Sequence, residues 1–433
     1  MAKQPSAAVG IDIGTRFIKV AEVRVGKPPV LTNVGVAPTP EGAVDAGGVI
    51  DKNAVAATLK RLLADSGIGT KQAVFSLAGQ NAVVVRILEV PRMNPVELRS
   101  HMDWEIQRNI PFADTRVQSA YEIIHRPGED PQDPNMEVVL AVAQQDAVDG
   151  LVDIADKVGL EPYAIDVEPL ALGRSLVLSQ PDMQHGAVVV INLGASATSI
   201  DIYDRGLLSF PRVLPTGGDM MTRAVADRLM VSEAEAEQLK VQLAEVLMDQ
   251  IPIGTPFGMP GGGFYTPTLG GAAPTISPGM PFAGSESAPI PGLGAVPEGE
   301  EAPPETPPSP FETPAAPEPE LPAAQPATDA RKVQVFQAIY PLLEELISEI
   351  RRSVEYFRSR HTDVEIRQIL LCGGGAVIPN LDQFIATSIG IPTAIANPLR
   401  GVQLNVKRHG PEYVAAHAHL LAVAIGMGMH PCF

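Results

Sequence analysis

The chain has 433 residues, a formal net charge of −18 and two cysteines, Cys372 and Cys432. The negative charge argues against a nucleic-acid partner, because phosphate contacts need clustered Lys and Arg. Two thiols supply neither a disulfide framework nor a zinc site, and the length exceeds the roughly 100–200 residues typical of one domain.

Residues 7–88 predict the N-terminal part of a first α/β lobe. Runs rich in β-branched residues alternate with Gly-containing turns, which is typical of strands, and one stretch has helical spacing. The predicted strands are 9–13, 17–25, 30–36, 73–77 and 83–90, and the predicted helix is 54–65. A later segment, 163–185, is expected to add a helix to the same lobe.

Residues 89–162 change character and predict a small inserted α+β subdomain. Its elements are expected to be a helix at 95–110, strands at 120–124 and 138–143, and a helix at 146–158. Pro111 ends the first helix, and Gly159 follows the second.

Residues 186–250 and 331–410 predict a second lobe. It opens, like the first, with two strands joined by a short turn, at 187–193 and 198–203, and the capping box Ser232-x-x-Glu235 begins one of its helices. The further predicted elements are helices at 219–229, 232–247, 333–357 and 381–389 and a strand at 366–371.

The C-terminal segment, 411–433, predicts a buried helix. Its apolar run, 414–429, contains two histidines and is shorter than the roughly 20 residues that span a bilayer. No signal peptide is expected at the start, because Asp12 interrupts the first apolar run. We therefore expect a cytoplasmic protein without direct membrane insertion, which reaches a membrane through partners.

Residues 251–330 predict a disordered, acidic, Pro-rich insert. The stretch from Ile251 to Thr328 holds 20 of the 42 prolines, and no Lys or Arg lies between Lys240 and Arg331. Such a composition buries too little apolar surface to offset the entropy of ordering. It serves either as a spacer or as a docking segment for a partner.

Two strand–turn–strand units carry the clearest chemistry. Asp12, Gly14 and Thr15 follow an apolar strand, and Asn192 and Gly194 follow another. Tight turns of this kind aim backbone N–H groups at phosphate oxygens, and a carboxylate beside them suits hydrated Mg²⁺. The pair therefore predicts two lobes that clamp a phosphate chain; the alternative is two unrelated hairpins.

Two glycine clusters extend this pattern. Gly217 and Gly218 open a predicted helix, whose N–H groups would favour an anion. Gly373, Gly374 and Gly375 follow a predicted strand, and glycines there let the backbone approach a flat base closely.

In this order, with Glu168-Pro169 between the turns, these segments resemble the nucleotide site of the actin-like superfamily, which includes actin, heat-shock chaperones, sugar kinases, MreB and FtsA. Within it the chain resembles the type IV pilus assembly protein PilM family. That resemblance includes 166–169 and 369–375 and extends outside the site, to 90–98, 104–112, 159–162 and 348–357.

The resemblance implies a two-lobed actin-like ATPase fold that binds ATP and Mg²⁺. Asp12 would hold Mg²⁺ through water, and Glu168 would orient the attacking water. The implied nucleotide contacts are Asp12, Gly14, Thr15, Asn192, Gly194, Thr198, Gly217, Gly218, Glu237, Lys240, Gly373, Gly374 and Gly375. Glu237 and Lys240 are alternatively a solvated pair on one helix face. Asn192 replaces the usual Asp and brings no negative charge, so we expect slow or absent hydrolysis.

The resemblance also implies a partner, the cytoplasmic N-terminal tail of a PilN-like membrane protein, bound beside the inserted subdomain. Met93, Leu98, Trp104 and Phe112 are the candidate contacts, and their alternative role is the subdomain's own core. Other inner-membrane and motor components of the pilus, and self-association, are further expected partners. An FtsA-like filament former and a small-molecule kinase remain alternatives; the first is disfavoured because the chain stops directly after an apolar helix.

Overall fold

The computed structural model describes residues 4–77, 79, 82–112, 114–127, 130, 132–251 and 325–433. The chain divides into two units, 1–253 with 326–433, and 254–325. Nearly all of the second unit, and with it most of the predicted Pro-rich insert, lies outside the described residues.

The first lobe is built on a six-stranded sheet. Its strands, in spatial order, are β10 (Glu161–Val167), β6 (Gln72–Leu77), β1 (Ala7–Ile13), β2 (Phe17–Arg24), β3 (Val30–Pro38) and β16 (Gln403–Leu404). The first three strands of the chain form an antiparallel meander, and β6 pairs with β1 in parallel. A short hairpin, β4 (Val44–Asp45) with β5 (Gly48–Val49), lies outside this sheet.

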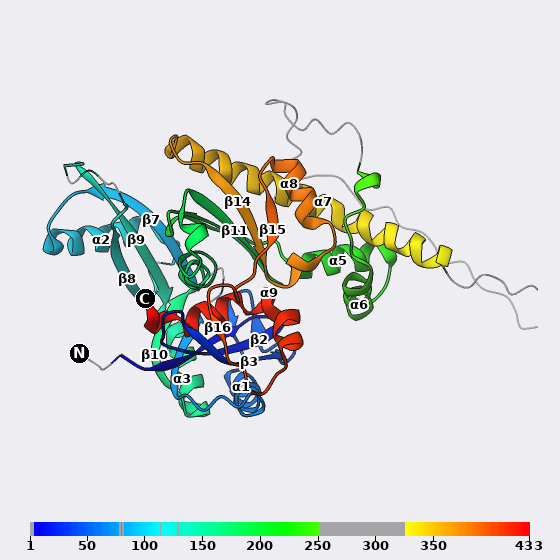
Figure 1. The fold of residues 1–433 in the computed structure, drawn as a ribbon, viewed down its shortest axis with the longest axis horizontal. Helices are drawn as coiled ribbons and strands as arrows, with labels where there is room; N and C mark the ends of the chain where they lie inside the picture. Colours follow the sequence, from blue (N-terminus) through cyan, green and yellow to red (C-terminus); the bar gives the residue numbers. More distant parts are fainter. Residues whose placement is uncertain are drawn as a thin grey trace, which may run out of the picture. The chain divides into compact units, whose positions relative to one another are not determined.

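The second lobe repeats this order in a five-stranded sheet. Its strands are β13 (Leu207–Leu214), β12 (Thr198–Asp204), β11 (Ala187–Leu193), β14 (Ile366–Cys372) and β15 (Thr393–Ile395). Again a three-stranded antiparallel meander is followed by a parallel strand, β14, on its first member. The two hairpins predicted from the turns thus occupy equivalent places in two lobes of the same topology (Figure 1).

The inserted subdomain is a three-stranded antiparallel sheet with one helix. The sheet orders β7 (Val83–Pro91), β9 (Asn135–Gln144) and β8 (Val117–Ile124), and α2 (Pro95–Asn109) packs on it. This changes the bounds expected for the subdomain, 89–162. Helix α3 (Gln145–Val158) packs against the first lobe, and β10 pairs with β6, so both belong to the first lobe.

Helices cover both faces of the first sheet. On one face, α1 (Lys52–Asp65) and α3 pack their apolar stripes against β1 and β6. On the other face lies α9 (Pro411–Gly428), on the side of the second lobe (red in Figure 1). A β-carbon at Gly10 would lie 2.0 Å from Ala424 O, so α9 rests directly on the backbone of β1.

Helix α4 (Glu168–Leu172) continues from β10 into a π-helical turn, Gly173–Leu178. Its apolar residues lie in a cluster that holds side chains from both sheets and from α9, among them Val74, Val190 and Val423. The start of α4 is therefore fixed at the junction between the lobes.

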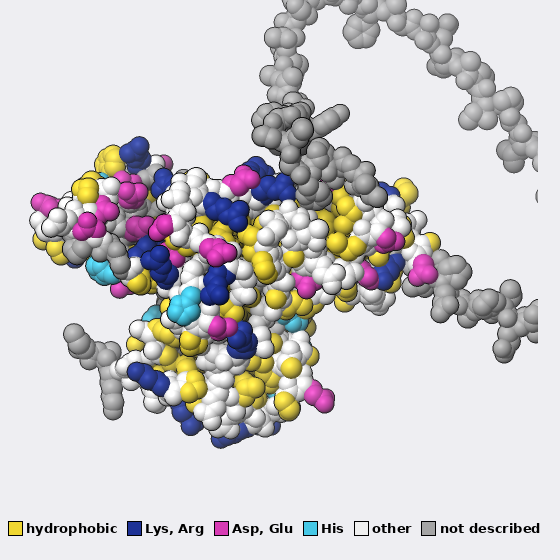
Figure 2. Space-filling model, turned by 45° about the horizontal axis from the view of Figure 1, so that its top comes forward, with side chains coloured by type: hydrophobic (Ala, Val, Ile, Leu, Met, Phe, Trp, Pro, Cys, Tyr) yellow, Lys and Arg dark blue, Asp and Glu magenta, His cyan; other side chains and the backbone are white. Residues whose placement is uncertain are grey.

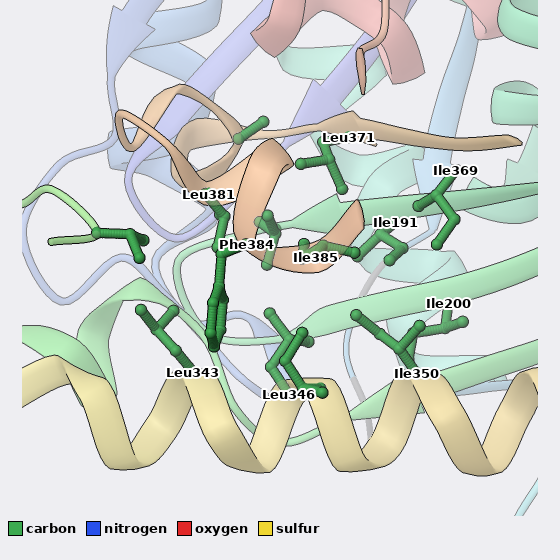
Figure 3. Close-up of a cluster of buried hydrophobic side chains, with 14 of the residues drawn as sticks. Ile191, Ile200, Leu343, Leu346, Ile350, Ile369, Leu371, Leu381, Phe384 and Ile385 are labelled. Carbon is green, nitrogen blue, oxygen red and sulfur yellow. The ribbon is translucent and has the colours of Figure 1, made fainter. Parts of the chain in front are cut away.

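The second lobe has the largest core. Helix α7 (Gln325–Arg360) lays one stripe along the sheet, α8 (Leu381–Ile389) closes one end, and α5 (Gly218–Leu229) and α6 (Glu233–Leu243) complete the lobe. Figure 3 shows the residues that meet there: Leu343, Leu346 and Ile350 from α7, Leu381, Phe384 and Ile385 from α8, and Ile191, Ile200, Ile369 and Leu371 from the sheet. This core anchors the strand ends that carry the second turn.

Charged side chains of both signs are interleaved over the visible face of the described residues in Figure 2. Within the described part of the chain, no helix is both long enough and apolar enough to cross a bilayer. The final helix, α9, is buried within the protein, as the sequence predicted.

Candidate functional site

A cleft of about 890 Å³ lies between the two hairpin turns. The first turn lines it with residues 12–17 and the second with residues 192 and 194–197, while the start of α5, one face of α6 and the loop after β14 complete the wall. Sequence positions almost 200 residues apart therefore meet around one space.

The first turn is held by its own backbone. Gly14 N–H donates to Phe17 O at 3.0 Å, and Thr39 Oγ1 donates to Gly14 O at 2.7 Å. Asp12 and Lys19 face each other across β1 and β2 and form an ion pair of 2.7 Å, largely shielded from solvent. The predicted Asp12, Gly14 and Thr15 all line the cleft.

The second turn rests on the start of α5. Gly218 N–H donates to Gly194 O at 3.0 Å and Asp219 N–H donates to Ala195 O at 2.9 Å. A β-carbon at Gly217 would lie 2.4 Å from Ala195 O. The expectation that this helix start offers free N–H groups to an anion is wrong for these two amides, because the turn's carbonyls already accept from them.

Glu168, at the start of α4, lies beneath the second turn. Its Oε1 accepts hydrogen bonds from Asn192 Nδ2 and Ser199 Oγ, both at 2.8 Å. Burial raises the pKa of Glu168, the two hydrogen bonds oppose that rise, and the charge of Asp12 adds to it. The structure thus brings Glu168 and Asn192 together, as the prediction of a shared site requires.

Asp201 extends this cluster and was not predicted. It is 1% exposed, its Oδ2 lies 3.0 Å from Ser199 Oγ, and its Oδ1 finds no hydrogen-bond partner among the described residues. Burial and the nearby charge of Glu168 raise the pKa of Asp201 well above its usual value. Since a hydroxyl donates one proton, Ser199 cannot donate to both acids, and a proton on one of the two carboxyls would satisfy both contacts.

Thr198 does not line the cleft, contrary to the prediction. It is buried, and its hydroxyl donates to Thr216 O at 2.6 Å. Side chains alternate along a strand, so Ser199 and Asp201 line the cleft while Ile200 points into the core of the second lobe. The side chain of β12 that lines the cleft is thus one residue further along the strand than the predicted one.

Glu237 and Lys240 form part of the cleft wall rather than a solvated pair. Lys240 Nζ donates to Gly218 O at 3.0 Å, Thr222 Oγ1 at 2.9 Å and Glu237 Oε2 at 2.8 Å. Burial alone would raise the pKa of Glu237, but hydrogen bonds from Lys240 and Thr222 lower it below its usual value. This network ties α6 to the start of α5.

The loop after β14 supplies the remaining wall, and Gly373, Gly374 and Gly375 all line the cleft. Gly373 has φ +84°, and a β-carbon there would lie 2.5 Å from Asn192 Oδ1. The glycine therefore allows the loop to approach the second turn closely, whereas the predicted approach of this backbone to a flat base stays a prediction.

The predicted partner contacts separate into two groups. Leu98 is 3% exposed within the subdomain core, and Phe112 packs on a neighbouring cluster. Met93 and Trp104 instead line a shallow hollow on the outer face of α2, where Trp104 is 49% exposed. For Leu98 the alternative role, a place in the subdomain's own core, is therefore the one that its burial supports.

Sequence reasoning gave no role to several polar residues of the cleft. Arg16, Lys19, Ser199, Asp201 and Asp219 all line it. For the two on β12 the polar–apolar alternation of Ser-Ile-Asp-Ile from Ser199 to Ile202 held the necessary information. No local sequence pattern indicated a role for Arg16. It lies in a glycine-containing turn, and such turns are common.

Comparisons with known proteins agree with this architecture. The cell division protein FtsA of Bacillus subtilis (strain 168) is 25% identical over 264 residues, which are 56% of this chain and 59% of the relative. FtsA of Porphyromonas gingivalis is 37% identical over 98 residues, 23% of this chain and 20% of the relative. The chain thus spans at most about three-fifths of the curated relatives named here.

A solved structure, the PilM-PilN type IV pilus biogenesis complex, matches with a TM-score of 0.71 at 23% identity and covers 100% of both chains. This likeness confirms the predicted actin-like fold. A family model described as type IV pilus assembly protein PilM matches residues 10–251 and 332–431, which include both turns, the inserted subdomain and the loop after β14. The chain belongs to the type IV pilus assembly protein PilM family.

Proposed function

We propose that the cleft binds ATP together with Mg²⁺. The observation that carries this proposal is the placement of two hairpin turns of like construction, one from each lobe, around one cavity. Its volume of about 890 Å³ falls within the range of small-molecule sites, roughly 300–1,000 Å³.

The residues present fit a magnesium ion that is carried by the nucleotide. Among the described residues, no group of three or more His, Cys, Asp or Glu is arranged to hold a metal. Mg²⁺ commonly keeps several waters and takes phosphate oxygens with one or two carboxylates. Asp12 supplies such a carboxylate at the cleft, and its ion pair with Lys19 fixes its position.

Titration of the purified protein with ATP and Mg²⁺ by calorimetry tests this proposal. We expect saturable binding, and we expect Asp12→Asn to weaken it at least tenfold in the presence of Mg²⁺. Asp156→Asn, an exposed change on α3 away from the cleft, is the matched control and should bind like the unmodified protein. No affinity for any adenine nucleotide would refute the proposal.

We further propose that hydrolysis is slow. The position that usually carries an Asp is Asn192, whose amide donates to Glu168 instead of adding a negative charge. Glu168 is also engaged by Ser199, so the carboxyl expected to orient water already has two partners. Steady-state phosphate release that stays near the uncatalysed level would support this part of the proposal.

The nucleotide-binding chain would act as a cytoplasmic scaffold that captures the N-terminal tail of a PilN-like membrane protein at the outer face of α2. Met93 and Trp104 offer apolar surface there, and the Arg108 guanidinium lies 5.0 Å from the Trp104 ring centroid. Such a tail would hold the protein at the inner face of the cytoplasmic membrane, near the other components of the pilus machine. Family membership supports this role.

Binding of a synthetic PilN-like tail, with and without ATP, tests the scaffold proposal. Trp104→Ala should weaken binding about tenfold, the effect of removing an aromatic anchor of an interface. Tyr356→Ala is the matched control, because Tyr356 is a similarly exposed aromatic, at 47%, on α7. If both variants lost tail affinity equally, or if neither lost any, the assignment of the tail-binding surface to α2 would be contradicted.

A further inference from the structure

Arg16 joins the two lobes across the cleft. It lies in the first turn, and its Nε donates to Asp219 Oδ1 at 2.8 Å on the second lobe. A second nitrogen of the same guanidinium lies 2.7 Å from Asp219 Oδ1 and 3.7 Å from Glu237 Oε2. A single side chain of the first turn thus contacts both helices, α5 and α6, that wall the opposite side.

Neither acid depends on Arg16 for its charge to be stable. Asp219 lies in the first turn of α5, where the helix dipole favours a negative charge. Glu237 already accepts hydrogen bonds from Lys240 and Thr222. Release of the guanidinium would therefore strand neither carboxylate.

The contact itself is suited to exchange. The Arg16 side chain is 45% exposed, and exposed ion pairs contribute little to stability. A guanidinium binds phosphate oxygens with the same planar, two-pronged geometry that it offers to carboxylates. Arg16 also lies one residue after Thr15, in the turn that faces the phosphate chain under the proposed function.

We propose that Arg16 is a cross-lobe latch which a nucleotide phosphate captures: in the empty cleft it binds Asp219 and Glu237, and in the filled cleft it binds a phosphate oxygen. This inference rests on the proposed nucleotide function. Asp219 is then an internal competitor of the phosphate, because its carboxylate holds the Arg16 guanidinium until the nucleotide binds.

Competition predicts opposite effects for the two partners. Arg16→Gln should weaken nucleotide binding about ten- to a hundredfold, as expected for the loss of a charge-assisted hydrogen bond to phosphate. Asp219→Asn should tighten binding severalfold, because it frees the guanidinium. In the double variant most of the Asp219→Asn gain should vanish, since no guanidinium remains to be freed.

The experiment is a double-mutant cycle on nucleotide affinity with the full chain, using ATP and ADP with Mg²⁺. Two exposed changes on α5, Arg223→Gln and Asp227→Asn, repeat the charge changes away from the contact and should each leave affinity within about twofold. A second measurement needs no ligand. In the nucleotide-free protein, Arg16→Gln should speed amide hydrogen exchange in the first turn and at the start of α5, because the lobes lose a tie.

Failure of the inference is distinguishable from failure of the proposed function. If the unmodified chain binds no nucleotide, the proposed function and the phosphate exchange both fall. If it binds and Arg16→Gln binds equally well, only the latch is overturned. Independent, additive effects of Arg16→Gln and Asp219→Asn would also overturn it, because general electrostatics alone would then account for both.

Discussion

The buried acid Asp201 gives the sharpest test of the electrostatics of the cleft. Asp201→Asn keeps the size of the side chain, and its amide can donate to Ser199 Oγ, which then donates to Glu168. The substitution thus reproduces the hydrogen bonds of a protonated Asp201 without any proton uptake. The protein would lose one buried ionisable group and keep the contact network.

The sign of the effect follows from linkage. Burial and the charge of Glu168 raise the pKa of Asp201 above its usual 3.8. Between that value and the folded-state pKa, the folded protein holds a proton that the unfolded chain has released, so stability falls as pH rises. The loss is about 1.4 kcal/mol for each pH unit of that window, and it is absent below the unfolded-state pKa.

Asp201→Asn should therefore match the unmodified protein near pH 4 and exceed it increasingly as the pH rises. Because Glu168 and Asp201 interact through Ser199, the midpoint belongs to the pair and not to one residue. Urea unfolding at several pH values measures the effect, with Asp156→Asn as an exposed control. Parallel stability curves for Asp201→Asn and the unmodified protein would refute the buried-proton argument.

Three further predictions concern the turn, the packing and the insert. Asn192→Asp should raise steady-state ATP turnover; no rise would contradict the explanation that Asn192 slows hydrolysis. Without Mg²⁺ the same change should lower the free energy of unfolding by about 1.5–3 kcal/mol, because it removes a hydrogen bond to a buried carboxylate. Gly10→Ala should cost at least the roughly 1–3 kcal/mol typical of overpacking, since its β-carbon would meet Ala424 O at 2.0 Å, whereas Gly69→Ala, with no atom within 4 Å, should be nearly neutral in the same urea assay. Deletion of 252–324 should leave nucleotide affinity unchanged, and a large loss would show that the segment contributes to the site.

Local patterns were sufficient to predict the two lobes. Each hairpin is indicated by an apolar run, a glycine-containing turn and a second apolar run, and these are patterns of neighbouring residues. The helix around Leu343 and Leu346 was equally evident from its spacing, although the structure begins it at Gln325. In each lobe the antiparallel meander is extended by one parallel strand, which pairs with the first strand of the meander.

Non-local choices were not accessible in the same way. The sequence predicted α3 as a helix, but periodicity does not say which core receives an apolar stripe, so α3 was placed in the subdomain instead of the first lobe. The pairing of β10 with β6 joins segments almost 90 residues apart, with a complete subdomain between them. The bounds of the inserted α+β subdomain depend on such strand pairings.

Errors within the site were errors of phase. Along β12 a shift of one residue exchanges Thr198 for Ser199, and along α2 Leu98 lies on a buried face whereas Trp104 lies on an exposed one. A motif names a segment, whereas its chemistry depends on which side of the strand or helix faces the cleft. Only the packing of the second lobe decides that for β12.

The two turns are alike in backbone but differ in charge, and under the proposed function this difference would separate nucleotide binding from hydrolysis. The first turn carries Asp12, Arg16 and Lys19, all at the cleft, so it can hold a phosphate chain and its cation. The second offers the neutral Asn192, which donates to Glu168, and the pKa values of Glu168 and Asp201 beside it are both raised by burial. Activation of water needs a negative charge or a free base on that side, whereas retention of a nucleotide does not. Under the proposed function, such a site would favour a long-lived nucleotide complex, a state that a scaffold can use to keep its two lobes in a fixed relation.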